Sequence, residues 1–122
     1  MRLFQSFRVT GIANTTVYDS GLKSTDAEKK KLIQVHLQMN AQAATDDNDI
    51  QGYHERAKVF DVPEKFIPTQ LVTNTTLVQP GDVSRVIPVD LDIPAGETFK
   101  VAIKCAATLE ILRGIYEYEI TA

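Results

Sequence analysis

Residues 32–41 read LIQVHLQMNA, and polar and apolar side chains alternate along the whole stretch. The apolar set is Ile33, Val35, Leu37, Met39 and Ala41, and the polar set is Gln34, His36, Gln38 and Asn40. Successive side chains of a β-strand point to opposite faces, so this period of two predicts a strand with one buried face and one polar face.

The same alternation recurs in the C-terminal third of the chain. Residues 87–93 read IPVDLDI and residues 99–105 read FKVAIKC, with Pro94, Ala95 and Gly96 between them. Proline and glycine are typical of tight turns. The pattern predicts an antiparallel hairpin, in which Asp90 and Asp92 face Lys100 and Lys104.

Weaker strand patterns complete the chain. They cover residues 3–9, 15–18, 49–60 and 70–78, and a clear alternation follows at residues 116–120. About eight strands with turn residues between them predict an all-β fold, an antiparallel jelly-roll-like β-sandwich. A length of 122 residues fits one domain spanning 1–122. The predicted core is Ile33, Val35, Leu37, Val89, Leu91, Phe99, Val101, Ile103, Tyr116 and Tyr118.

One segment departs from the strand pattern. Thr25-Asp26-Ala27-Glu28 has the form of a capping box, in which a threonine hydroxyl and a glutamate carboxylate each bond a free backbone N–H. It predicts one short helical segment near residues 25–31.

Composition excludes several classes of function. The net charge is -3 and the longest basic run is Lys29–Lys31, so no direct nucleic-acid binding is expected. No apolar run approaches the roughly 20 residues of a membrane span. Residues 1–10 are too polar for a signal peptide, which predicts a cytoplasmic location. With a single cysteine, Cys105, the chain forms no internal disulfide.

The candidate chemical sites are each incomplete. Residues 46–52 resemble the start of a calcium-binding loop, but Lys58 stands where a bidentate glutamate is needed. A solvated turn between strands is favoured there. His36 and His54 are expected to be neighbours across a hairpin, without a third metal ligand. Cys105 continues an apolar alternation and is expected in the core. We therefore predict a protein that is not an enzyme and has no metal and no cofactor.

The polar face of residues 32–41 carries amides and a histidine but no full charge. Such side chains suit a wet protein interface or a sugar site, and an ordinary solvent-exposed face is the alternative. The next strand, 49–60, has no clean apolar face and contributes Tyr53 and Arg56. We predict that the hairpin from Leu32 to Phe60 forms a subunit interface. Its candidate residues are Gln34, His36, Gln38, Asn40, Tyr53 and Arg56.

The stretch 87–105, with Ile93-Pro94-Ala95-Gly96-Glu97, and the ending Tyr116-Glu117-Tyr118-Glu119-Ile120 resemble the closing hairpins of small single-jelly-roll virion proteins. The resemblance implies a structural protein that self-assembles into a viral or phage capsid or other virion component. Its partners would be copies of itself and other structural proteins, in a virion assembled in the host cytoplasm. The resemblance transfers no functional residues. The alternative function is a carbohydrate- or ligand-binding β-sandwich module.

Overall fold

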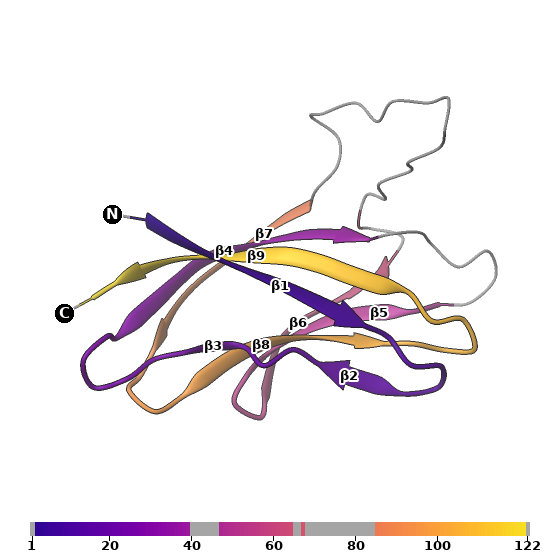
Figure 1. Cartoon of the computed structure of the whole chain (residues 1–122), viewed down its shortest axis with the longest axis horizontal. Coiled ribbons are helices and arrows are strands. Elements are labelled where there is room, and N and C mark those ends of the chain that lie inside the picture. Colours follow the sequence, from indigo (N-terminus) through magenta and orange to yellow (C-terminus); the bar gives the residue numbers. More distant parts are fainter. Residues whose placement is uncertain (1, 40–46, 65–66, 68–84, 122) are drawn as a thin grey trace.

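The computed structural model describes residues 2–39, 47–64, 67 and 85–121. The strands are β1 (Arg2–Thr10), β2 (Thr16–Tyr18), β3 (Leu22–Lys23), β4 (Lys30–Met39), β5 (Asp49–His54), β6 (Ala57–Pro63), β7 (Arg85–Ile93), β8 (Thr98–Lys104) and β9 (Ile111–Ile120). They form two antiparallel sheets packed face to face, which confirms the all-β sandwich (Figure 1). Within the described part of the chain, no helix has the length and apolar character needed to cross a membrane.

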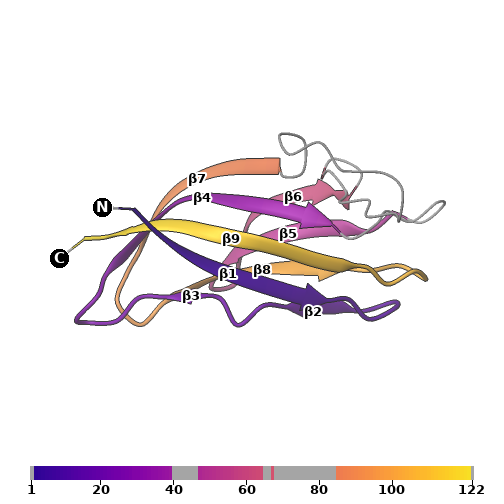
Figure 2. The same ribbon diagram turned by 45° about the horizontal axis from the view of Figure 1, so that its top comes forward.

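The strand order is non-sequential in both sheets. Sheet A has the order β1-β9-β4-β7, and Figure 2 shows these four strands side by side. Sheet B has the order β2-β8-β5-β6, and β3 also pairs with β8. The chain therefore crosses repeatedly between the sheets, and strands far apart in the sequence become neighbours.

The hydrophobic core lies between the two sheets. Of the predicted core residues, Val35, Leu37, Phe99, Val101, Ile103 and Tyr116 are buried, and Val89, Leu91 and Tyr118 are half-buried against them. The Tyr116 ring lies 4.6 Å from the Phe7 ring and 6.1 Å from the Phe99 ring, so aromatic contacts join the sheets. Each such contact stabilises a core by more than its buried area alone.

Ile33 was wrongly predicted to face the core. The pairing of β4 with β9 and β7 shifts register between Leu32 and Gln34. A β-bulge at this point breaks the period of two, so that Leu32 and Val35 are both fully buried while Ile33 is only half-buried.

The predicted hairpin between residues 87–93 and 99–105 is wrong, although both strands exist. β7 pairs with β4 in sheet A, whereas β8 pairs with strands of sheet B. The turn around Gly96, whose φ of 85° suits glycine, carries the chain from one sheet to the other. Asp90 accordingly faces β4, where the Lys31 Nζ lies 3.2 Å from its carboxylate, and not Lys100.

The helical segment predicted near residues 25–31 is absent. The Thr25 hydroxyl accepts a hydrogen bond from the Glu28 amide at 3.0 Å, as in a capping box. The Thr25 amide, however, donates to the backbone carbonyl of Glu28 at 2.9 Å and closes a turn. The Lys30 amide already donates to Ser24 Oγ at 2.9 Å, so the chain enters β4 without room for a helix.

The stretch 49–60 forms two strands and not one. β5 and β6 pair with each other and are joined by a turn at Glu55 and Arg56, where Glu55 has a φ of 56°. A glutamate-arginine pair is not a recognisable turn signal, which is why the pattern concealed this turn. The hairpin predicted from Leu32 to Phe60 is also wrong, because β4 and β5 belong to different sheets. The strand predicted at residues 70–78 lies outside the described residues.

Candidate functional site

A buried carboxylate lies on the outer face of sheet A, the face that points away from the core. Glu117 is in the middle of β9, and only 5% of its surface is exposed. Its Oε2 accepts a hydrogen bond from Arg2 at 2.7 Å. Its Oε1 lies 2.9 Å from His36 Nε2 and 3.0 Å from Gln34 Nε2. β9 lies between β1 and β4, so donors from both neighbours converge on this one side chain.

This network changes the ionisation of Glu117. The hydrogen bonds from His36 and Gln34, together with Arg2, lower the pKa of the Glu117 carboxyl below its ordinary value. Burial acts in the opposite direction but is outweighed. Glu117 is therefore held as a carboxylate whose two oxygens both already accept hydrogen bonds.

Exposed apolar side chains surround the network. The exposed fractions are 62% for Phe4 on β1, 37% for Ile115 on β9 and 40% for Val86 on β7. Ile115 lies opposite His36, which in turn lies opposite Val86, and Phe4 lies opposite Glu117. The apolar residues therefore share the outer face with the Glu117 network. We refer to Phe4, Gln34, His36, Val86, Ile115 and Glu117 as the sheet A patch.

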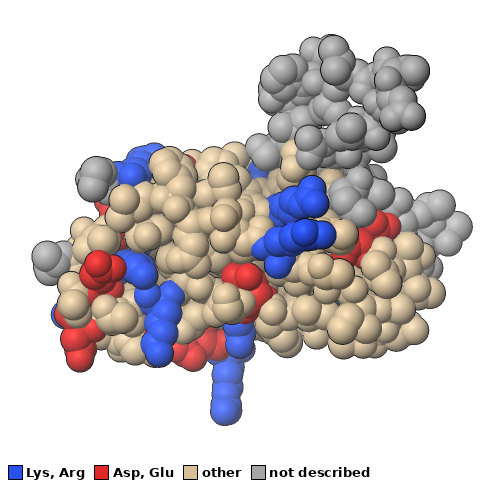
Figure 3. All heavy atoms as spheres, viewed as in Figure 1, with Lys and Arg blue, Asp and Glu red and all other residues tan. Residues whose placement is uncertain are grey.

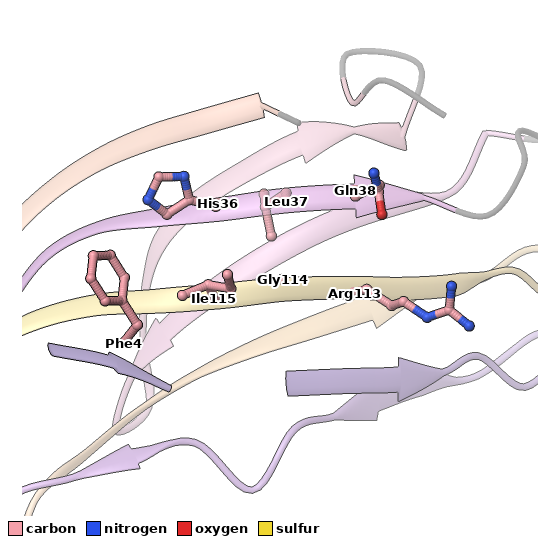
Figure 4. Close-up of a pocket in the computed structure, with 7 residues that line it drawn as sticks. All are labelled: Phe4, His36, Leu37, Gln38, Arg113, Gly114 and Ile115. Atoms are coloured by element: carbon pink, nitrogen blue, oxygen red, sulfur yellow. The ribbon is translucent and has the colours of Figure 1, made fainter. Parts of the chain in front are cut away.

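A shallow hollow of about 360 Å³ adjoins the patch. It is lined by Phe4, His36, Leu37, Gln38, Arg113, Gly114 and Ile115, from three neighbouring strands (Figure 4). Gly114 lets these strands approach closely, because a Cβ there would stand 2.2 Å from the His36 carbonyl oxygen. The hollow presents an aromatic ring and an isoleucine beside an exposed arginine, a composition suited to contact with another macromolecule.

The predicted site residues do not form one surface. Gln34, His36 and Gln38 share the outer face of sheet A, as the alternation indicated. Asn40 lies outside the described residues. Tyr53 lies on sheet B and Arg56 is exposed in the β5–β6 turn, so neither adjoins the polar face through a hairpin.

Tyr53 instead belongs to a cluster on the outer face of sheet B. Its ring lies 5.6 Å from that of Tyr18, which is half exposed, and its hydroxyl donates to Gln51 at 2.7 Å. The Lys100 ammonium lies 4.9 Å from the centre of the Tyr18 ring, a cation–π contact. Two tyrosine rings in tilted contact beside an amide are a surface on which a sugar ring could pack.

The two histidines are not neighbours, contrary to the sequence prediction. His36 contacts Glu117 on β9, whereas His54 Nε2 lies 2.8 Å from Glu97 Oε1 near the β7–β8 turn. Among the residues that the structure describes, no three His, Cys, Asp or Glu side chains are grouped to hold a metal ion. Cys105 is buried, as predicted, and burial raises the pKa of its thiol.

The acidic stretch before β5 has an internal role. Asn48 is fully buried, its side chain accepts from the Ala106 amide at 2.8 Å, and it donates to the Thr108 carbonyl at 2.9 Å. It also donates to Glu64 at 3.1 Å. Asn48 therefore ties the β8–β9 connection to the start of β5 and the end of β6, a role that the turn prediction missed.

Arg2, Phe4, Val86, Ile115 and Glu117 were not identified as site residues from sequence. The alternation of residues 116–120 places Glu117 on the face opposite Tyr116, so its outward direction could have been inferred. The convergence of three strands could not, because it depends on strand order. Comparison of the chain with family models, with curated proteins and with solved structures found no match.

Proposed function

We propose that this chain is a structural protein that self-associates through the sheet A patch and builds a larger particle. The observation that carries the proposal is the exposure of Phe4, Ile115 and Val86 around a carboxylate that is already hydrogen-bonded. Grouped apolar side chains exposed to water favour burial against a partner. A buried charge without partners would oppose such contact, but the donors of Glu117 come from its own chain.

The identity of the particle rests on the resemblance of residues 87–105 and 116–120 to single-jelly-roll virion proteins. On this proposal the chain is a capsid or other virion component, with copies of itself and other structural proteins as partners. It carries out no reaction, needs no cofactor and does not bind nucleic acid directly. The last point is supported by the face shown in Figure 3, where the Lys and Arg side chains are scattered and form no continuous band.

The test is a charge placed in the middle of the patch. Ile115→Lys should prevent association through the patch, so native mass spectrometry at high micromolar concentration should show smaller assemblies than the unmodified chain forms, because a buried lysine would face an apolar contact. The matched control is Leu109→Lys, which changes an apolar side chain that is 52% exposed in the β8–β9 connection. Assembly that persists in Ile115→Lys at the wild-type level would refute the role of the patch.

A ligand-binding module is the second candidate, and the Tyr18–Tyr53 cluster on sheet B favours it. Gln34 and His36 supply less support for a sugar site, because both already bind Glu117. Under this alternative the chain stays monomeric and binds glycans, and Tyr53→Ala removes that binding. Titration of a glycan library into the monomer, followed by calorimetry, separates the two functions.

A further inference from the structure

The outer edge of β1 has no strand partner among the described residues. β1 is the first strand of sheet A and pairs only with β9 (Figure 2). It contains nine residues in continuous register with β9, without a bulge. No proline interrupts it. An edge of this length presents a row of backbone donors and acceptors that can template another strand.

The direction of these backbone groups follows from one hydrogen bond. The Gly11 amide donates to the Glu110 carbonyl at 2.9 Å, and this pair continues the register in which Thr10 lies opposite Ile111. In antiparallel pairs, hydrogen-bonded and non-hydrogen-bonded positions alternate. The odd-numbered residues of β1 therefore bond to β9, and Phe4, Ser6 and Arg8 direct their amides and carbonyls toward the free edge.

The other edges of the sandwich carry features that discourage pairing. β7 contains Pro88, and Asp90, two residues further along, has a left-handed φ of 50° where the register shifts. β6 contains an irregularity and ends at Pro63. β2 and β3 have only three and two residues. Prolines, bulges and short strands all oppose edge-to-edge association, so β1 is the edge left open for it.

We infer that β1 pairs antiparallel with β1 of a second copy, about a two-fold axis at Ser6. The inference rests on the proposed self-association and specifies one of its contacts. With Ser6 opposite Ser6 of the second copy, every hydrogen-bonded position is an even-numbered residue, which matches the free backbone groups. This register also uses all nine residues of β1. The result is a closed dimer in which the two four-stranded A sheets join into one.

The side chains of β1 are complementary in this register. Phe4, 62% exposed, lies opposite Arg8 of the second copy on the outer face. Arg8 is exposed and makes no ion pair with any described residue; its neighbour on β9 is Arg113, also a cation. The dimer gives each Arg8 an aromatic ring to cover, and the two-fold axis repeats the contact. On the inner face Leu3 lies opposite Val9 of the second copy.

A dimer of this kind uses Phe4 but leaves Val86 on β7 and Ile115 on β9 of each copy available for another contact. A closed two-fold contact alone stops at two chains, whereas growth of a particle needs a second, different contact. The edge of β1 and the outer face of sheet A supply these two contacts. The dimer is therefore the expected building unit of the particle.

The register can be tested with an introduced cysteine. In Ser6→Cys the two thiols lie on opposing residues whose Cα atoms are about 5.5 Å apart, so a short bifunctional maleimide should link the full-length chains into a dimer. The control is Thr10→Cys, in which the two Cα atoms are about 27 Å apart along the strands and no link should form. The native Cys105 is buried and leaves both experiments unaffected.

A second pair of variants tests the side-chain contact. Arg8→Gln should raise the dimer dissociation constant by about 5- to 30-fold, because two cation–π contacts are lost. Lys104→Gln removes an exposed charge on β8 of sheet B, the sheet that does not contain β1, and should leave the constant unchanged. Equal effects of both variants would overturn the Phe4–Arg8 contact.

The outcomes separate this inference from the function on which it rests. An unmodified chain that stays monomeric contradicts both. A chain that self-associates while Ser6→Cys is not linked, or while Thr10→Cys is linked equally well, overturns the edge dimer and leaves the proposed self-association standing. Selective linkage of Ser6→Cys supports the edge dimer.

Discussion

The hydroxyl of Tyr116 on β9 accepts a hydrogen bond of 3.0 Å from the amide of Val101 on β8. The contact spans the core and joins sheet A to sheet B. It lies on the edge of β8 that faces away from β5, between the pairing positions of β2 and β3. The same hydroxyl donates to Asp19 at 2.8 Å, and burial raises the pKa of Tyr116, so the group stays protonated. The bridge fixes how the sheets are placed relative to each other.

Replacing this tyrosine tests the bridge. Tyr116→Phe should lower the free energy of unfolding by about 1–3 kcal/mol, because the Val101 amide is left buried without an acceptor. Urea denaturation of the variant measures the loss. Tyr118→Phe, at a half-buried position on the same strand, is the control and should change stability little. A Tyr116→Phe protein as stable as the parent would show that the bridge contributes nothing.

The core assignment can be checked at Ile103. This side chain is fully buried on β8, and Ile103→Ala should cost about 2–5 kcal/mol of unfolding free energy. Ile120→Ala, at a position that is 40% exposed, should cost much less. The comparison uses denaturant midpoints of the two variants. A loss at Ile103 below that at Ile120 would contradict the assignment of Ile103 to the core.

Stability should depend on pH through Glu117. The folded-state pKa of this carboxyl is lowered, so its contribution is fully present above the unfolded value of about 4.3 and is lost as the pH falls through the folded value. Glu117→Gln should therefore show a smaller loss of stability in this acidic window than the parent chain. The measurement is the urea midpoint at successive pH values.

Glu119→Gln supplies the control for the pH experiment. Glu119 is on the same strand and its side chain is 40% exposed. Its Oε1 lies 3.8 Å from Arg2, the only ion-pair contact it makes among the described residues. The variant should keep the acid dependence of the parent chain. If both glutamine variants follow one curve, the Glu117 network is not the source of the dependence.

Removal of metal ions should leave the fold unchanged. Among the described residues no cluster of candidate ligands is present, and the acidic stretch uses Asn48 for internal hydrogen bonds. A bound structural metal would couple to folding, so EDTA would then lower Tm. We expect the same Tm with and without EDTA. A Tm that falls by many degrees in EDTA would show that the fold depends on a bound metal ion.

Local alternation was enough to predict most of the strands and their faces. The outward direction of Gln34 and His36, and the burial of Val101 and Ile103, follow from the period of two within one strand. Ile33 was misplaced because a bulge depends on the neighbouring strands and not on the strand itself.

The order of the strands in each sheet could not be predicted from the sequence, and the reason is physical. The turn at Gly96 looks the same whether the next strand pairs with the previous one or crosses to the other sheet. The site depends on that order, because Arg2 and His36 reach Glu117 only when β1 and β4 flank β9. Such pairings join residues more than 80 positions apart, where short-range patterns carry no information.

Self-association of the unmodified chain is the central claim, and light scattering coupled to size-exclusion chromatography tests it most directly. A dilution series that begins at high micromolar concentration should show a mass well above that of one chain, falling toward the monomer as the protein is diluted. The mass of a single chain at every concentration would contradict the account.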